Sequence, residues 1–189
     1  MAAFLLSLGI IFVAELGDKS QLMALTFATR YRAWTILWAI TAATAVVHLF
    51  SVALGAAIGA ALPTDAISIV AGVAFFGFGV WTLRGDELDE EDEARARAGQ
   101  RSVFFAVGSA FFLAELGDKT MLATVTLATD NGWFGTWLGS TLGMVAADAL
   151  AIVVGQQLGA RLPERAVRIG AAATFFVFGV LLVLDGVRR

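Results

Sequence analysis

Six long hydrophobic runs alternate with polar stretches along the chain. The runs predict helices at residues 2–29, 34–62, 66–84, 102–129, 133–161 and 165–186. A helix needs about 20 apolar residues to cross a bilayer. Tryptophans near the ends of several runs suit the membrane interface. The pattern therefore predicts an all-α integral membrane protein with six transmembrane helices.

One polar stretch is longer than the others and lies at the middle of the chain. Residues 85–101 are dominated by Asp, Glu and Arg and are too polar to span a membrane. Such a composition is typical of a solvated linker, and a regulatory or cation-attracting role is the alternative. The linker divides the chain into residues 1–84 and 102–189.

The two parts of the chain repeat each other. The motif AELGDK occurs at residues 14–19 and again at residues 114–119. The same displacement of 100 residues matches Gly55, Gly59 and Leu62-Pro63 with Gly155, Gly159 and Leu162-Pro163, and Phe75-Phe76 with Phe175-Phe176. Each part contains three predicted helices, an odd number, so the second part must enter the membrane from the opposite side. The sequence thus predicts two inverted three-helix repeats, an architecture that recurs in transporters and places the substrate site between the repeats.

Arginines lie mainly on one side of this arrangement. One side carries Arg30, Arg32, Arg84, Arg95, Arg97, Arg101, Arg161, Arg165 and Arg168, and the other carries Arg188 and Arg189. Because cytoplasmic loops are enriched in Lys and Arg, we expect a cytoplasmic linker and extracytoplasmic termini, in a multi-pass protein of the cell inner (plasma) membrane.

Composition supports the membrane assignment and removes other classes. The chain is 59% hydrophobic with a mean hydropathy of +0.81, whereas soluble domains are about 45–50% apolar. Cysteine is absent, which excludes disulfides and thiolate metal sites. The net charge of −3 comes mostly from the linker, and the chain has no basic surface typical of nucleic-acid binding. No resident cofactor is predicted, and the sequence leaves a homo-oligomer open.

Charged residues in the first and fourth hydrophobic runs carry the candidate chemistry. Glu15 and Glu115 lie near mid-span, where a charged side chain costs about 2.5–3.5 kcal/mol on insertion scales. The motif adds Asp18 and Asp118, and Gly17 permits a local break of the helix. If the repeats bring the four carboxylates together, a divalent cation would remove their repulsion. The alternative is that each Glu simply pairs along its helix with the Lys four residues later.

Other side chains in the repeats are candidates for supporting roles. Further metal ligands are Ser20, Gln21, Thr120 and Met121, and the thioether would favour a softer transition metal over Ca²⁺. Lys19 and Lys119 either balance the acids when no metal is bound or face away from the ion. His48 and Asp148 match in the repeat at mid-span and are candidates for proton coupling.

The doubled motif, ELGDKS at 15–20 and ELGDKT at 115–120, resembles the GDT family of membrane cation exchangers, which has Golgi, chloroplast and bacterial members. The resemblance implies transport of Mn²⁺ or Ca²⁺ in exchange for protons, and bacterial relatives are associated with manganese export. It also implies that Glu15, Asp18, Glu115 and Asp118 bind the ion. We therefore expect a secondary transporter that exports Mn²⁺, or Ca²⁺, against protons, and not an enzyme. The alternatives are a lysine-exporter-like carrier of a small organic cation and an intramembrane hydrolase or lipid phosphatase.

Overall fold

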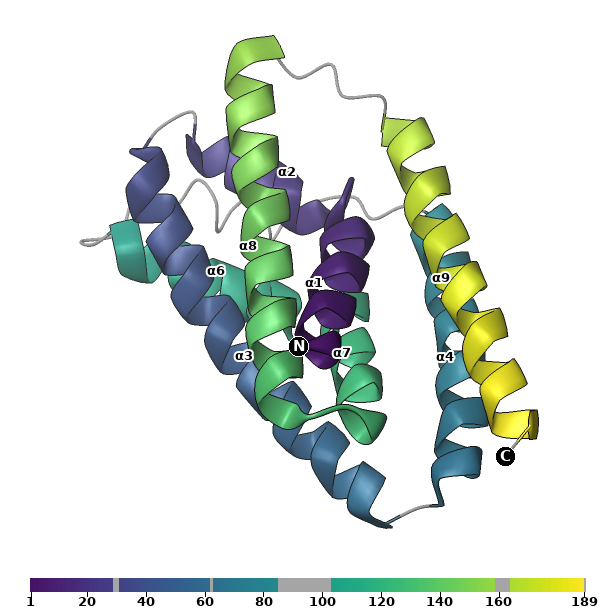
Figure 1. Ribbon diagram of the computed structural model, residues 1–189. Helices are drawn as coiled ribbons and strands as arrows, with labels where there is room; N and C mark the ends of the chain where they lie inside the picture. Colours follow the sequence, from purple (N-terminus) through teal and green to yellow (C-terminus); the bar gives the residue numbers. More distant parts are fainter. Residues whose placement is uncertain (29–30, 62, 85–102, 159–163, 189) are drawn as a thin grey trace.

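The computed structural model describes residues 1–28, 31–61, 63–84, 103–158 and 164–188, and every regular element within them is a helix (Figure 1). The helices are α1 (Ala2–Glu15), α2 (Lys19–Ala28), α3 (Ala33–Ala61), α4 (Thr64–Arg84), α6 (Val103–Glu115), α7 (Lys119–Asp130), α8 (Trp133–Leu158) and α9 (Glu164–Arg188). The linker predicted at residues 85–101 lies outside the described residues.

Four of the six predicted helices form as single helices. α3, α4, α8 and α9 each begin within two residues of the predicted start. The prediction of single helices at 2–29 and 102–129 was wrong, because each run divides into two helices at the motif. By length and composition, three helices of the described chain can cross a membrane: Ala33–Ala61, Ala66–Arg84 and Trp133–Val153. The apolar helices α1 and α6 are shorter because the motif ends them.

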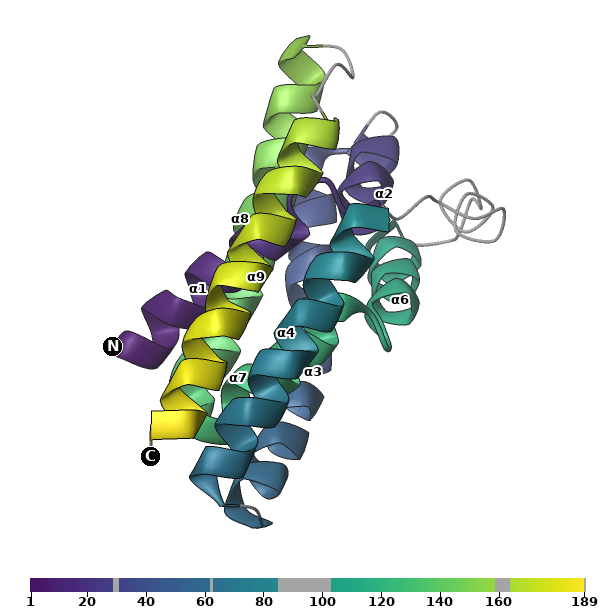
Figure 2. The same ribbon diagram turned by 90° about the vertical axis from the view of Figure 1, so that its right-hand side faces the viewer.

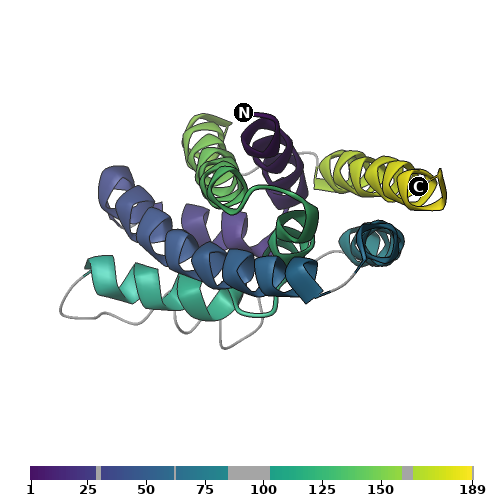
Figure 3. The ribbon, with the colours of Figure 1, turned by 60° about the horizontal axis from the view of Figure 1, so that its bottom comes forward.

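The long helices follow one another at opposite ends of the molecule in the two parts of the chain. The end of α3 and the beginning of α4 lie at the lower end of Figure 1, whereas α8 ends and α9 begins at the upper end. Figure 2 shows α4 and α9 side by side along much of their length. Viewed from below, the α4–α9 pair stands to one side of the remaining helices (Figure 3).

Residues one hundred positions apart contact each other where the two parts of the chain meet. The rings of Phe75 and Phe175 lie 5.6 Å apart between centroids, and those of Phe76 and Phe176 lie 6.1 Å apart. The Thr44 hydroxyl donates a hydrogen bond of 3.1 Å to the sulfur of Met144. Contact between equivalent positions is the pattern expected at a two-fold interface.

Each short helix that precedes a break packs on a long helix of the other part of the chain. The first half-helix α1 packs on α8, and its counterpart α6 packs on α3. Glycines bring helices into close contact: a Cβ on Gly139 of α8 would lie 2.4 Å from the carbonyl oxygen of Phe4 in α1, and one on Gly59 of α3 would lie 2.0 Å from that of Thr129 in α7. The small residues therefore serve close helix packing, as small residues commonly do in membranes.

Replacement of Gly139 with Ala should lower the melting temperature of the purified protein. The added methyl group overlaps a backbone carbonyl that cannot rotate away, and overpacking of this kind costs about 1–3 kcal/mol. Gly77→Ala in α4 is the matched control, because its Cβ would meet nothing within 4 Å. Thermal unfolding in detergent measures both; equal melting of the two variants would contradict the packing of α8 on α1.

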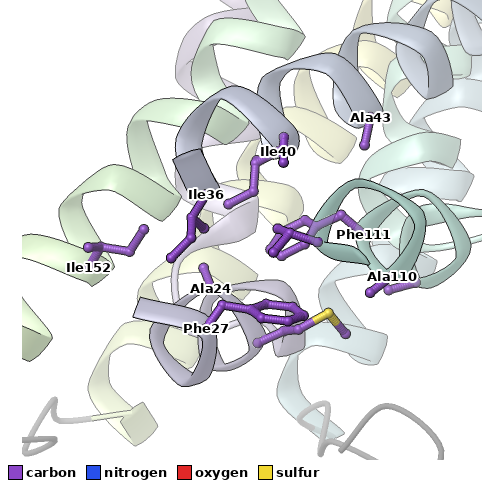
Figure 4. Close-up of a cluster of buried hydrophobic side chains, with 12 residues drawn as sticks. Ala24, Phe27, Ile36, Ile40, Ala43, Ala110, Phe111 and Ile152 are labelled. Carbon is purple, nitrogen blue, oxygen red and sulfur yellow. The ribbon is translucent and has the colours of Figure 1, made fainter. Parts of the chain in front are cut away.

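The four short helices beside the breaks form two half-helix pairs, α2 with α6 and α1 with α7, and each pair contributes to one buried apolar cluster. The first joins α2, α3 and α6 and contains Phe27, Ile40 and Phe111 (Figure 4). The second joins α1 and α7 and contains Ile11 and Leu127, and it also receives buried aromatic rings from α4 and α9. Phe75 and Phe175 therefore pack in the interior and do not face lipid.

The α4–α9 pair covers only one of these half-helix pairs. In the described parts of the chain, α4 packs on α7 and α9 packs on α1, without comparable packing of either on α2 or α6. A strict two-fold arrangement would contain all four contacts. The helices therefore depart from that symmetry in the position of α4 and α9.

Candidate cation-binding site

Each motif ends one helix and begins the next. α1 ends at Glu15 and α2 begins at Lys19, and Gly17 between them has φ of 75°. Gly117 has φ of 81° at the equivalent point between α6 and α7. Glycine adopts this left-handed conformation without the steric cost that other residues incur. The breaks are thus built into the sequence at Gly17 and Gly117.

Side chains four residues beyond each glycine bond back to the backbone of the break. The Gly17 N–H donates to Gln21 Oε1 at 2.8 Å, and the Gly117 N–H donates to Met121 Sδ at 3.2 Å. Gln21 also donates from Nε2 to the carbonyl oxygen of Ala147 at 3.0 Å. Both predicted ligands therefore hold the backbone of the break itself, through the N–H of Gly17 or Gly117.

The two glutamates are buried and oriented by hydroxyl groups. Ser20 Oγ donates to Glu15 Oε1, and Thr120 Oγ1 donates to Glu115 Oε2 at 3.0 Å. The second oxygen of each carboxylate is also buried, and it makes no hydrogen bond to the residues that the structure describes. Buried carboxylate oxygens are normally paired or coordinate a metal, so these two point to a ligand.

Aspartate and lysine pair across the repeats. The Lys119 ammonium forms an ion pair with Asp18, and Lys19 Nζ lies 4.0 Å from Asp118 Oδ1. The alternative that Lys19 pairs along its own helix with Glu15 does not describe this geometry, because the helix ends between positions 15 and 19. The two breaks are therefore tied together by reciprocal ion pairs.

These residues form one charged centre, comprising Glu15, Asp18 and Lys19 with Glu115, Asp118 and Lys119. Glu15 lies within electrostatic range of Glu115, Asp18 and Asp118. The described chain has no group of three or more His, Asp or Glu side chains already arranged to hold a metal. The four acids thus lie close together, as predicted. In this structure the lysines pair with the aspartates, and the hydroxyl groups of Ser20 and Thr120 donate to the glutamates.

The remaining candidates differ in their relation to the charged centre. Asp148 is fully buried, interacts electrostatically with Glu15 and Glu115, and makes no side-chain hydrogen bond to described residues. His48, its counterpart in the repeat, is equally buried, and neither ring nitrogen has a hydrogen-bond partner among described residues. Asp148 thus adds a fifth carboxylate to the electrostatics of the charged centre.

Comparison with known proteins places this arrangement in a family. The model of the divalent cation/proton antiporter GDT1 matches residues 3–90 and 103–189, which together include both breaks and all six residues of the charged centre. The chain belongs to the GDT1 family. It is therefore a membrane protein of a cation antiporter family, which is a class of transporter and not of enzyme.

Relatives of the GDT1 family align along nearly the whole chain. A Vibrio cholerae protein, whose name gives it as a candidate manganese exporter, is 33% identical over 95% of this chain and 90% of its own length. A GDT1-like protein of Synechocystis is 28% identical over 96% of both chains. GDT1-like protein 5 of Arabidopsis thaliana is 25% identical over 99% of this chain and 97% of its own. No solved structure matches the chain.

Proposed function

We propose that this GDT1-family protein exports Mn²⁺ in exchange for protons, with Ca²⁺ as the alternative cargo. The family supports the exchange of a divalent cation for protons, and the name of the Vibrio relative favours manganese. The observation that carries the proposal is the pair of buried glutamates, each with one oxygen that described residues leave unused. Two such oxygens on opposite repeats suit a single hard cation between them.

The proposed ion ligands are Glu15, Asp18, Glu115 and Asp118, and protons compete for the same carboxylates. If all six residues of the charged centre are ionised, two negative charges remain uncompensated, which one divalent ion or two protons would neutralise. Metal and protons then exclude each other from one site. Further oxygens or sulfur would come from Ser20, Gln21, Thr120 and Met121, once the hydrogen bonds of these side chains rearrange.

We propose six membrane crossings in two inverted repeats, residues 1–84 and 102–189. The linker at 85–101 lies in the cytoplasm, with both termini outside, in the plasma membrane. Alternating access follows if the α4–α9 pair moves from the half-helices α1 and α7 toward their repeat counterparts α6 and α2. The observed one-sided packing of that pair supports this movement.

Reconstituted liposomes test the exchange directly. Mn²⁺ added outside vesicles that contain the full-length protein should enter while protons leave, and a pH-sensitive dye and a Mn²⁺-quenched dye report the two fluxes. Protein-free vesicles are the control. Metal entry without any proton movement would contradict the exchange, and the absence of both fluxes for Mn²⁺ and for Ca²⁺ would contradict the proposed function.

One observation favours the organic-cation alternative. The charged centre already holds an ammonium group, that of Lys119, against Asp18, so the amine of a small organic cation would meet similar chemistry. The same vesicles discriminate the two functions. Transport of a radiolabelled amine such as lysine, unaffected by excess Mn²⁺, would replace metal export as the best explanation.

A further inference from the structure

The two lysines of the charged centre are the only lysines in the chain. All the other basic side chains among the 13 Lys and Arg residues are arginines. An arginine guanidinium binds a carboxylate through two parallel hydrogen bonds, whereas a lysine ammonium is a compact charge on a flexible stem. A lysine is therefore the easier of the two to displace from a carboxylate. Its restriction to this position indicates a function beyond general surface charge.

The geometry places each ammonium at a proposed metal ligand of the other repeat. Lys119 is buried with Asp18, and their side chains are 3% and 0% exposed. Lys19 lies at the longer distance of 4.0 Å from Asp118, and its side chain is 23% exposed. An ammonium at this position occupies the carboxylate that a metal would need, because both cations bind the same oxygens. Lys119 is the more completely inserted of the two.

We propose that Lys119 and Lys19 are tethered counter-ions that occupy the aspartates of the opposite repeat whenever the metal is absent, and that a divalent ion binds only by displacing them. This inference rests on the proposed function for the identity of the displacing ion. Both ammonium groups move only within the reach of their own side chains. They set the affinity for metal and hold the two breaks together between transport cycles.

The two ion pairs differ in burial, so the two lysines should differ in how much they oppose metal binding. The flexible stem of Lys19 already reaches a partly exposed position, so its departure from Asp118 requires little rearrangement. Lys119 must leave a buried carboxylate, so its displacement requires more of the metal's binding free energy. Removal of Lys119 should therefore change metal affinity more than removal of Lys19.

Calorimetric titration of purified full-length protein with Mn²⁺ tests the proposal. Lys119→Met should bind Mn²⁺ about tenfold more tightly than wild type, the change expected if the lysine-free form is only about one tenth of the empty protein. Lys19→Met should give a smaller gain. Lys119→Arg should weaken binding, since a two-pronged cation is harder to displace. Arg188→Met, which removes an exposed charge at the end of α9, should bind as wild type.

Unchanged or weaker Mn²⁺ binding by folded Lys119→Met would overturn the proposal. If Lys119→Met does not fold, lysine NMR of the wild-type protein tests the same proposal. Protein with lysine side chains labelled with ¹³C at Cε has two lysine NMR signals, and diamagnetic Cd²⁺ should shift both as the ammoniums leave their aspartates. If calorimetry shows that Cd²⁺ binds while both signals stay in place, the lysine proposal is wrong and the metal site stands. If neither Mn²⁺, Ca²⁺ nor Cd²⁺ binds, the proposed function itself is wrong.

Discussion

Replacement of either Glu15 or Glu115 with Gln should abolish Mn²⁺/proton exchange in liposomes. Each glutamate offers one buried oxygen that described residues do not use, and Gln keeps the shape of the side chain while it removes the charge. Loss of residues that only support metal ligands costs about 10–100-fold in affinity or activity, so loss of a ligand should cost at least as much. Because one site draws on both repeats, each single replacement should have the full effect.

A carboxylate outside the charged centre is the matched control for both variants. Asp130 is exposed at the end of α7, so Asp130→Asn should exchange Mn²⁺ at the wild-type rate. Size-exclusion profiles and helix content should be the same for all three variants. Retention of about half of the activity in each glutamate variant would mean that the repeats act as separate sites, and the shared site would be wrong.

Mn²⁺ binding should tighten steeply as the pH rises. The metal needs ionised carboxylates, so every proton that it displaces makes its affinity about tenfold higher per pH unit across the range in which the acids titrate. Displacement of two protons would give about a 100-fold change per pH unit. At low pH the protons occupy the carboxylates and the metal dissociates. Calorimetric dissociation constants measured at a series of pH values give the slope.

Asp148 separates metal binding from proton release in this experiment. Its carboxylate interacts electrostatically with Glu115, yet it is not among the proposed ligands. Asp148→Asn should therefore still bind Mn²⁺ with a shallower dependence on pH, and His48→Gln serves as the comparison from the other repeat. A wild-type affinity that is the same at every pH would contradict competition between metal and protons.

The sequence was sufficient to predict much of this arrangement because its main features are encoded locally. The hydrophobic runs predicted the starts of α3, α4, α8 and α9. Gly17 indicated a break, because glycine alone readily adopts the left-handed backbone found there. The displacement of 100 residues predicted that Glu15 and Glu115 would meet, and the two are within electrostatic range.

Features that depend on packing between the repeats could not be predicted in the same way. Spacing along one helix suggested that Glu15 and Lys19 pair, but the break removes that geometry and the lysines reach the opposite repeat. Gln21 and Met121 accept hydrogen bonds from the N–H groups of Gly17 and Gly117, which would bond within the helix if the helix were continuous. The one-sided position of α4 and α9 could not be predicted from a repeated sequence, because the repeat by itself favours neither side.

Anomalous X-ray scattering from crystals soaked in Mn²⁺ tests most directly whether two breaks form one site. We expect one manganese peak per chain, within about 2.6 Å of carboxylate oxygens, with Glu15 or Asp18 on one side and Glu115 or Asp118 on the other. A peak held by the acids of one repeat alone, or a pair of separate peaks, would contradict it.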